Sequence, residues 1–371
     1  MRLAIVTQLL APYRLGLFEA YWRRVDALRV FVMANRHSDR SWSVGSHRFE
    51  CEVLPGFHVV LPDYPLRGLS ERVHFNLGTR AALGRFRPDV VMTGGFSVAH
   101  FAAYRYCRRE RIPHVSWGEL TLRDGAQRSR LKRWLRRTMI GGSAGCVASS
   151  SVSREAFLAY GAPEERTLTS LMPVDIGLFR AAAGGAVPVP GPPVVLSVGR
   201  LVPGKGFEEL LRAFALLRRD VPQALLRIAG DGADRLRLEG LAADLGLRDA
   251  VEFLGFVEPA ALARLYRASA VFAFASLHDT FAAVIPEAMA AGAVVAASTH
   301  AAATGDLIED GVTGFRIEPQ QPAETAAVLR CAIGLDPAER ERIVAAAARR
   351  VERVDAERSA DETIRFLESL R

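Results

Sequence analysis

Short apolar runs alternate with helix-forming stretches along the whole chain, and this alternation limits the folds open to it. Ten such runs are expected to form strands, at residues 2–9, 28–33, 89–93, 114–117, 145–149, 194–198, 225–229, 251–254, 271–275 and 293–297. Strands that are separated by helices favour parallel sheets with helical crossovers. The sequence therefore predicts an α/β protein in which the same rhythm occurs twice.

The length of 371 residues favours two domains of about 150 to 200 residues over one ordinary core. Residues 181–193 are rich in Ala, Gly and Pro and lack an apolar period, which is typical of an exposed linker. We expect an N-terminal domain over 1–180, this linker, and a C-terminal domain over 194–355. An amphipathic helix over 356–371 can pack on either domain, including back on the N-terminal one.

Charge and cysteine content narrow the function classes. The net charge of +7 and the pI near 9.6 suit phosphate-bearing ligands, nucleic acid or an anionic membrane. The basic residues are dispersed and not interleaved with aromatic ones, which argues against nucleic acid. Four distant cysteines without a C-x-x-C pair indicate neither a zinc site nor a disulfide framework. The N-terminal apolar run is broken by Gln8 and Pro12, and no window is long enough to span a membrane, so we expect a cytoplasmic enzyme.

Two segments of the second half carry candidate chemistry. Val194–Gly206 reads VVLSVGRLVPGKG, in which an apolar strand runs into a glycine-rich turn with Arg200 and Lys205. Two cations at the mouth of a strand suit a diphosphate, although a solvated turn would look the same. The segment SLHDTFAAVIPEAMAAG places Asp279 before an expected helix and Glu287 eight residues further on, inside it. A helix rises roughly 12 Å over eight residues, a span that fits a nucleotide diphospho-sugar.

These segments resemble the C-terminal domain of retaining glycosyltransferases of family 4, which have the GT-B fold. VGRLVPGKG, IAGDG, VEFLGFV, EAMAAG and EDGVTGF occur in that family's order. In the first half, APYR, RPDVVMTGG, WGE and PVD extend the resemblance over essentially the whole chain, and they are most similar to the branch that begins with a Pro-Tyr-Arg turn. The resemblance implies two Rossmann-like domains facing across a cleft.

The resemblance also implies residue roles. The donor-binding positions are Arg200, Lys205, Phe256, Phe281, Ala282, Ala283 and Glu287, with Asp279 as a catalytic candidate that holds hydroxyls of the donor sugar. Arg200, Lys205 and the amides near Phe281 would bind the diphosphate, Glu287 the ribose and the backbone around Phe256 the base. Two positions depart from the family, which usually has Glu at Asp279 and Gly at Ala282. These departures leave the identity of the donor open.

The first half is expected to bind the acceptor. Many family members have a histidine near the reacting sugar, at a position where this chain has Glu119, a second catalytic candidate that would hydrogen-bond a hydroxyl. Further acceptor-side candidates are Tyr13, Arg14, Gly94, Gly95 and Trp117. The two glycines allow either a ligand or another loop to approach closely, or form a simple turn. The histidines of this half are expected in ordinary core or interface positions.

The implied reaction moves a hexosyl group from a UDP- or GDP-sugar to a hydroxyl of a glycan, lipid-linked sugar or small molecule, with the anomeric configuration retained. It needs no cofactor and no metal at the diphosphate. A 2-epimerase of sugar nucleotides and a donor-binding subunit without catalysis remain alternatives. The basic stretch Arg128–Arg137, RSRLKRWLRR, has apolar residues at helical spacing, so it is either a peripheral membrane contact at the inner face or a packed helix with a solvated side.

Overall fold

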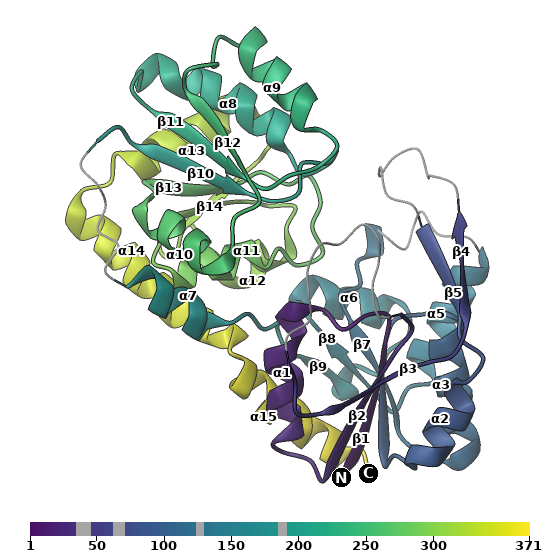
Figure 1. The fold of residues 1–371 in the computed structure, drawn as a ribbon. Helices are drawn as coiled ribbons and strands as arrows, with labels where there is room; N and C mark the ends of the chain where they lie inside the picture. The colour runs from purple at the N-terminus through teal and green to yellow at the C-terminus, as the bar shows by residue number, and fades with distance from the viewer. Residues whose placement is uncertain (35–45, 62–70, 124–129, 185–190) are drawn as a thin grey trace. The chain divides into compact units, whose positions relative to one another are not determined.

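The computed structural model describes residues 1–34, 46–61, 71–123, 130–184 and 191–371, which fold into two compact units (Figure 1). Unit 1 comprises Met1–Pro62, Ser70–Val174 and Val354–Arg371, and unit 2 contains Asp175–Arg353. The division between Val174 and Asp175 lies before the expected linker. The reason is that α7 (Ile176–Ala183) packs on α10 (Pro259–Ala268) and α11 (Val284–Ala290) of unit 2. The first residues of the expected linker are therefore helical, and 185–190 lie outside the described residues.

Unit 1 is built on a parallel sheet with the strand order β3-β2-β1-β6-β7-β8-β9. The strands are β1 (Arg2–Thr7), β2 (Ala27–Val32), β3 (Glu50–Val53), β6 (Val90–Gly94), β7 (His114–Gly118), β8 (Gly145–Ala148) and β9 (Thr167–Thr169). Ile5 of β1 lies between Val30 and Met92 in the register, and all three are fully buried. Strands β4 (Phe57–Leu61) and β5 (Glu71–Phe75) form a separate antiparallel pair.

Helices cover both faces of this sheet. On one face, α1 (Pro12–Trp22) packs beside the chain's last helix, α15 (Ala356–Ser369), over a shared core that includes Phe18 and Leu367 (Figure 1). The other face carries α2 (Thr79–Phe86), α3 (Val98–Glu110), α5 (Arg130–Gly141) and α6 (Ser151–Ala159), and a 3-10 turn follows at Glu164–Arg166. The end of the chain thus belongs to the unit in which the chain begins.

Unit 2 has a six-stranded parallel sheet in the order β12-β11-β10-β13-β14-β15. Its strands are β10 (Val194–Val198), β11 (Leu225–Ala229), β12 (Val251–Gly255), β13 (Val271–Phe274), β14 (Val295–Ser298) and β15 (Phe315–Ile317). Besides α7, α10 and α11, its helices are α8 (Phe207–Asp220), α9 (Arg235–Asp244), α12 (Ala302–Leu307), α13 (Pro322–Ile333) and α14 (Pro337–Arg350), followed by a 3-10 turn at Val351–Val354. Both units are Rossmann-like, which confirms the predicted α/β class.

Candidate active site

The topology of unit 2 brings the ends of β10 and β13 together. The strand order reverses between these two neighbours, and open parallel sheets bind ligands at such a reversal, beyond the carboxyl ends of the strands. Lys205 lies in the loop after β10, and Asp279 lies in the segment after β13. Their side chains form an ion pair with 2.6 Å between Lys205 Nζ and Asp279 Oδ2, and both are mostly buried. Two candidates that are 74 residues apart in sequence therefore meet where a ligand is expected.

Close backbone packing fixes the loop that carries the lysine. Gly206 has a φ of +72°, and a Cβ there would lie 1.7 Å from the carbonyl oxygen of Ala275, so no other residue fits without movement. The carbonyl oxygen of Gly204 accepts a hydrogen bond of 3.0 Å from the amide of Leu277. The glycines predicted to permit tight geometry thus attach this loop to the segment that carries the aspartate.

Hydrogen bonds fix both the backbone and the side chain of Asp279. Its amide donates to the carbonyl oxygen of His300, and its carbonyl oxygen accepts from the amide of Ala302, both at 3.2 Å. Its Oδ1 accepts a hydrogen bond of 3.1 Å from the amide of Phe281, while Oδ2 accepts from Lys205. Both carboxylate oxygens therefore have protein partners, and a sugar hydroxyl that binds here has to share or displace them.

Helix α11 begins later than the sequence analysis expected. Its first residue is Val284, so Asp279 precedes it by five residues and Glu287 is its fourth residue. The expected separation of eight helical residues is therefore wrong, because the bonds to residues 300–303 hold 279–283 as a turn. Pro286 lies in the first turn of α11, where the missing N–H removes no helical hydrogen bond.

Ala282 adopts a backbone conformation that favours glycine. Its φ is +74°, in the left-handed region, although its side chain is a buried methyl group. A residue with a Cβ atom loses about 1 kcal/mol in this conformation. This cost is a physical reason for the glycine that family 4 glycosyltransferases usually have at this position. The amides of Ala282 and Ala283 donate no hydrogen bond to any residue in the described ranges. They remain available to an anionic group.

Glu287 lies in a partly closed environment on α11. Burial raises the pKa of its carboxyl group to about 7, although the neighbouring hydroxyl of Tyr266 lowers it somewhat. That hydroxyl is buried and makes no well-aligned hydrogen bond to the described part of the chain. Burial, followed by the nearby carboxylate, raises the pKa of Tyr266 well above its usual value. Tyr266 is itself fixed by edge-on packing against Phe272, with 5.0 Å between ring centres.

The remaining donor-side candidates differ in accessibility. Arg200 is exposed, and Phe256, directly after β12, is 70% exposed. Phe281 is buried in the core, and its amide and carbonyl groups are bonded to Asp279 and Ala303, so of this segment the amides of Ala282 and Ala283 are the ones without a partner in the described residues. A cavity of about 150 Å³ borders the same loop at Gly204 and Gly206, but neither Asp279 nor Glu287 lines it.

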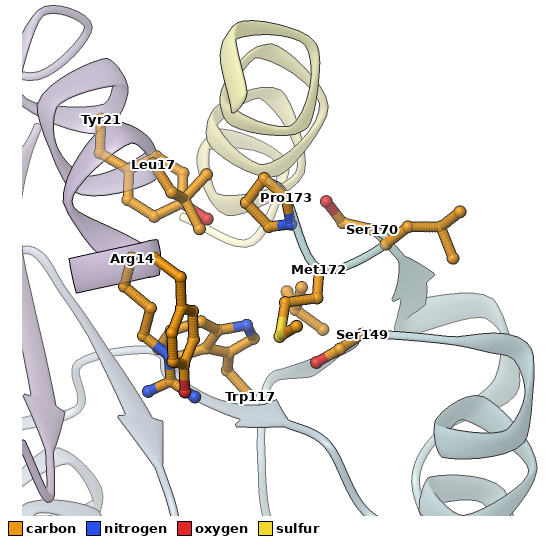
Figure 2. A pocket seen from close by; sticks show the side chains of 11 residues that line it. Arg14, Leu17, Tyr21, Trp117, Ser149, Ser170, Met172 and Pro173 are labelled. Carbon is orange, nitrogen blue, oxygen red and sulfur yellow. The ribbon is translucent and has the colours of Figure 1, made fainter. Parts of the chain in front are cut away.

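Unit 1 has a similar arrangement at its own reversal, between β1 and β6. Arg14, which follows β1, donates from Nη2 to Glu119 Oε1 and from Nη1 to Thr7 Oγ1, both at 3.1 Å. Its guanidinium carbon lies 4.5 Å from the ring centre of Trp117. Figure 2 shows these two side chains next to each other. Burial by itself lowers the pKa of Arg14, but Tyr13 and Glu119 outweigh it and raise the pKa. Three candidates of the first half, Tyr13, Trp117 and Glu119, thus gather around the guanidinium of a fourth, Arg14.

A small cavity of about 10 Å³ adjoins this cluster, between α1 and the segment after β9 (Figure 2). Its lining includes Arg14, Tyr21, Trp117, Ser149 and Ser170. The Nε of Arg14 is buried and has no hydrogen-bond partner among the described residues. A space of this volume holds about one water molecule, so this cavity is no substrate pocket by itself.

Gly94 and Gly95 follow β6 and make room for neighbouring side chains. A Cβ on Gly94 would lie 3.2 Å from the Trp117 ring, and one on Gly95 would lie 2.7 Å from the ring of His100. The sequence left open whether these glycines admit a ligand, admit another part of the protein or form a simple turn. In the structure, side chains of the protein itself approach them closely. Burial lowers the pKa of both His100 and His114 to about 3.

The sequence analysis did not identify three polar residues near Asp279. They follow β14 and β15 at the same edge of the sheet: Glu318 accepts from His300 Nε2 at 2.8 Å and from Thr299 Oγ1 at 2.9 Å. Burial raises the pKa of Glu318, but these two hydrogen bonds outweigh it and lower the pKa overall. Their position in the sequence could have identified them, because polar residues that directly follow parallel strands lie at the edge of the sheet where ligands bind.

Two further surveys cover the described residues only. No group of three or more His, Cys, Asp or Glu side chains in them is arranged to hold a metal ion. None of the helices described here has the length and the apolar character to cross a bilayer.

Comparison with known proteins shows what unit 2 is similar to. Residues 186–350 match the family Glycosyl transferases group 1. A D-inositol 3-phosphate glycosyltransferase of Nocardia farcinica is 35% identical over 198 residues, covering 49% of this chain and 43% of the relative. An enzyme of the same name from Geodermatophilus obscurus is 36% identical over 222 residues, covering 55% and 48%. The chain spans about half the length of these curated relatives.

Similarity to solved structures extends over the whole chain. Anabaena HepE in complex with UDP has a TM-score of 0.79 at 22% identity, with 100% of both chains covered. Sucrose-phosphate synthase from Thermosynechococcus elongatus has a TM-score of 0.78 at 19% identity, with 100% of this chain and 99% of that chain covered. At these identities the likeness defines the fold alone. The protein has the GT-B fold, built from two Rossmann-like units.

Proposed function

We propose that this protein is a retaining glycosyltransferase that moves a hexosyl group from a nucleotide diphospho-sugar to an acceptor hydroxyl. The observation that carries the proposal is the meeting of Lys205 and Asp279 at the reversal between β10 and β13, within the region that matches Glycosyl transferases group 1. Structures of Anabaena HepE with UDP and with UDP-glucose make UDP-sugars the first donors to test, ahead of GDP-sugars.

In the proposed donor complex, Lys205 leaves its ion pair and binds the diphosphate together with Arg200 and the free amides of Ala282 and Ala283. Preorganised donors of this kind stabilise the negative charge that grows on a leaving diphosphate, where electrostatics lowers the barrier most. The released Asp279 carboxylate then accepts hydrogen bonds from the donor sugar, and Glu287 accepts them from the ribose.

The bond changes of the proposed reaction balance without a further reactant. The bond between the anomeric carbon and the diphosphate oxygen breaks, and a bond from the acceptor oxygen forms on the same face. The acceptor proton passes to the leaving diphosphate. Glu119 orients the acceptor hydroxyl, and Arg14 is a positioning residue that holds Glu119 in place. Metal independence is part of the proposal.

The decisive experiment measures donor binding and transfer in variants of unit 2. Thermal unfolding with UDP, GDP and their sugars identifies the donor, and transfer is then measured for Lys205→Ala and Glu287→Ala. We expect losses of at least about 10²-fold, the scale on which single transition-state contacts contribute, with melting temperatures near that of the unaltered protein. Arg212→Ala, which removes an exposed cation of α8 that is paired with Glu208 within the same helix, is the matched control. Well-folded Lys205 and Glu287 variants with full activity would refute the assignment.

Four further measurements test the alternatives and the proposed mechanism. Epimerised sugar nucleotide, formed from donor without acceptor, would favour the 2-epimerase. Nucleotide binding without transfer to any acceptor would favour a subunit that lacks catalysis, for which the Asp279 and Ala282 departures are the motivation. Transfer that persists in EDTA is expected, and inversion at the anomeric carbon, read by NMR, would contradict the retaining mechanism.

A further inference from the structure

The net positive charge of the chain is concentrated in one stretch of unit 1, although basic residues occur along the whole chain. Residues 79–141 contain 14 of the 48 Lys and Arg residues but only 4 of the 41 Asp and Glu residues, which gives this stretch a charge of +10. The rest of the chain has a charge of −3, because the total is +7. The excess basicity of the protein is therefore a property of α2, α3, α5 and the segments between them.

Helix α5 adds apolar side chains to this charge. Met139 and Ile140 are buried, whereas Leu131 is 70% and Trp134 is 54% exposed. Trp134 packs against Phe101 of α3, with 6.1 Å between the ring centres. Leu131 and Trp134 are three residues apart, so these two exposed apolar side chains are neighbours on one face of the helix.

Exposed arginines flank these two side chains. Arg130, Arg133 and Arg137 are exposed on α5 and follow the same helical spacing as the apolar pair, so cations border the apolar side chains along the helix. The last turn of the neighbouring helix α3 contains Arg108 and Arg109. Helices α3 and α5 cover the same face of the sheet. Basic and apolar groups thus share one side of unit 1.

We propose that α5 attaches unit 1 to an anionic lipid bilayer, with Leu131 and Trp134 inserted among the headgroups and the arginines bound to lipid phosphates. A helix with apolar residues bordered by Lys and Arg lies in the membrane interface and gains from both burial and charge. Nucleic acid would neutralise the arginines but offers no apolar phase for Leu131. This inference is independent of the proposed transfer reaction.

The test is co-sedimentation of the full chain with vesicles. We expect binding to vesicles of phosphatidylcholine with one third phosphatidylglycerol, little binding to phosphatidylcholine alone, and weakening as salt rises. The triple variant Arg130→Glu/Arg133→Glu/Arg137→Glu should bind at least about tenfold more weakly, since each cation at the surface contributes on the order of 1 kcal/mol. The matched control reverses three exposed arginines of unit 2, Arg248, Arg264 and Arg342, which gives the same change of net charge.

Tryptophan fluorescence reports insertion directly. The emission should shift to the blue with anionic vesicles, and Trp134→Phe, which keeps an apolar ring, should remove most of this shift while binding remains. Melting temperatures establish that each variant is folded. Equal binding to both kinds of vesicle, equal effects of the two triple variants, or binding to DNA but not to vesicles would overturn the proposal.

Discussion

At the scale of single residues, the protonation state of Glu287 should affect both the stability of the protein and the binding of the donor. Burial raises the pKa of its carboxyl group from 4.5 to about 7, so the folded protein favours the neutral form. The ionised form is the better acceptor for ribose hydroxyls. A group of this kind lowers stability when it ionises, and the two properties should therefore depend on pH in opposite directions.

We expect the contribution of Glu287 to the free energy of unfolding to be largest below pH 4.5. This contribution should fall by about 1–3 kcal/mol as the pH rises from 4.5 to about 7. Chemical denaturation between pH 5 and 8 measures this. Glu287→Gln keeps the neutral shape, so its stability should lack that component of the pH dependence. An identical pH dependence in both proteins would show that Glu287 is ionised throughout.

Ala282 offers a second test at this scale, because the effect of a glycine depends on backbone conformation. Ala282→Gly removes a left-handed alanine but also a buried methyl group, and these contributions of about 1 kcal/mol each should nearly cancel. Ala283 has a φ of −54°, so Ala283→Gly should cost about 1 kcal/mol. Urea denaturation of both variants checks the contrast, and equal losses would contradict it.

Roles of single residues could be predicted only where a motif names them. Lys205 and Asp279 were both predicted as site residues, but their ion pair was not, because a contact over 74 positions depends on which strands are neighbours. His300 and Glu318 belong to no motif and become visible only when β14 and β15 lie side by side. For the same reason, the contact of Arg14 with Glu119 could not be predicted.

At the scale of elements, the predicted strands are continuous apolar runs, and all of them except β12 lie between two other strands. All ten expected runs are strands, with ends that differ by at most two residues. The sequence analysis missed β3, β9 and β15, which are at the edges of the two large sheets, and also the separate antiparallel pair β4 and β5. An edge strand has one strand neighbour and needs fewer apolar residues, as β3 illustrates with three exposed residues out of four.

Helix α15 provides the prediction at this scale. Leu367 is fully buried in the core that α15 shares with α1, although it lies near the end of the chain. Leu367→Ala should destabilise unit 1 by about 2–4 kcal/mol through the lost apolar contact and the cavity left behind. Leu236→Ala, at an 82% exposed leucine of α9, is the control and should change stability little. A similar small effect at both positions would mean that α15 does not stabilise unit 1.

At the scale of the whole molecule, the two units have separate cores, and the candidate donor residues all lie in unit 2. A nucleotide that binds there stabilises that unit by about 2.7 kcal/mol at 100 times its dissociation constant. In calorimetry we expect UDP to raise the unfolding transition of unit 2, whereas Leu367→Ala lowers that of unit 1. A single transition that both changes move together would show that the units unfold as one.

The sequence by itself determined the two α/β units and most of their strands, because buried parallel strands are continuous apolar runs that can be recognised locally. It also determined the tight glycine turns, which follow from the chemistry of one residue. Only the tertiary structure decided where the units divide, where α11 begins and which side chains meet. These depend on contacts between distant segments: α7 joins unit 2 and α15 joins unit 1 because their apolar faces are buried there.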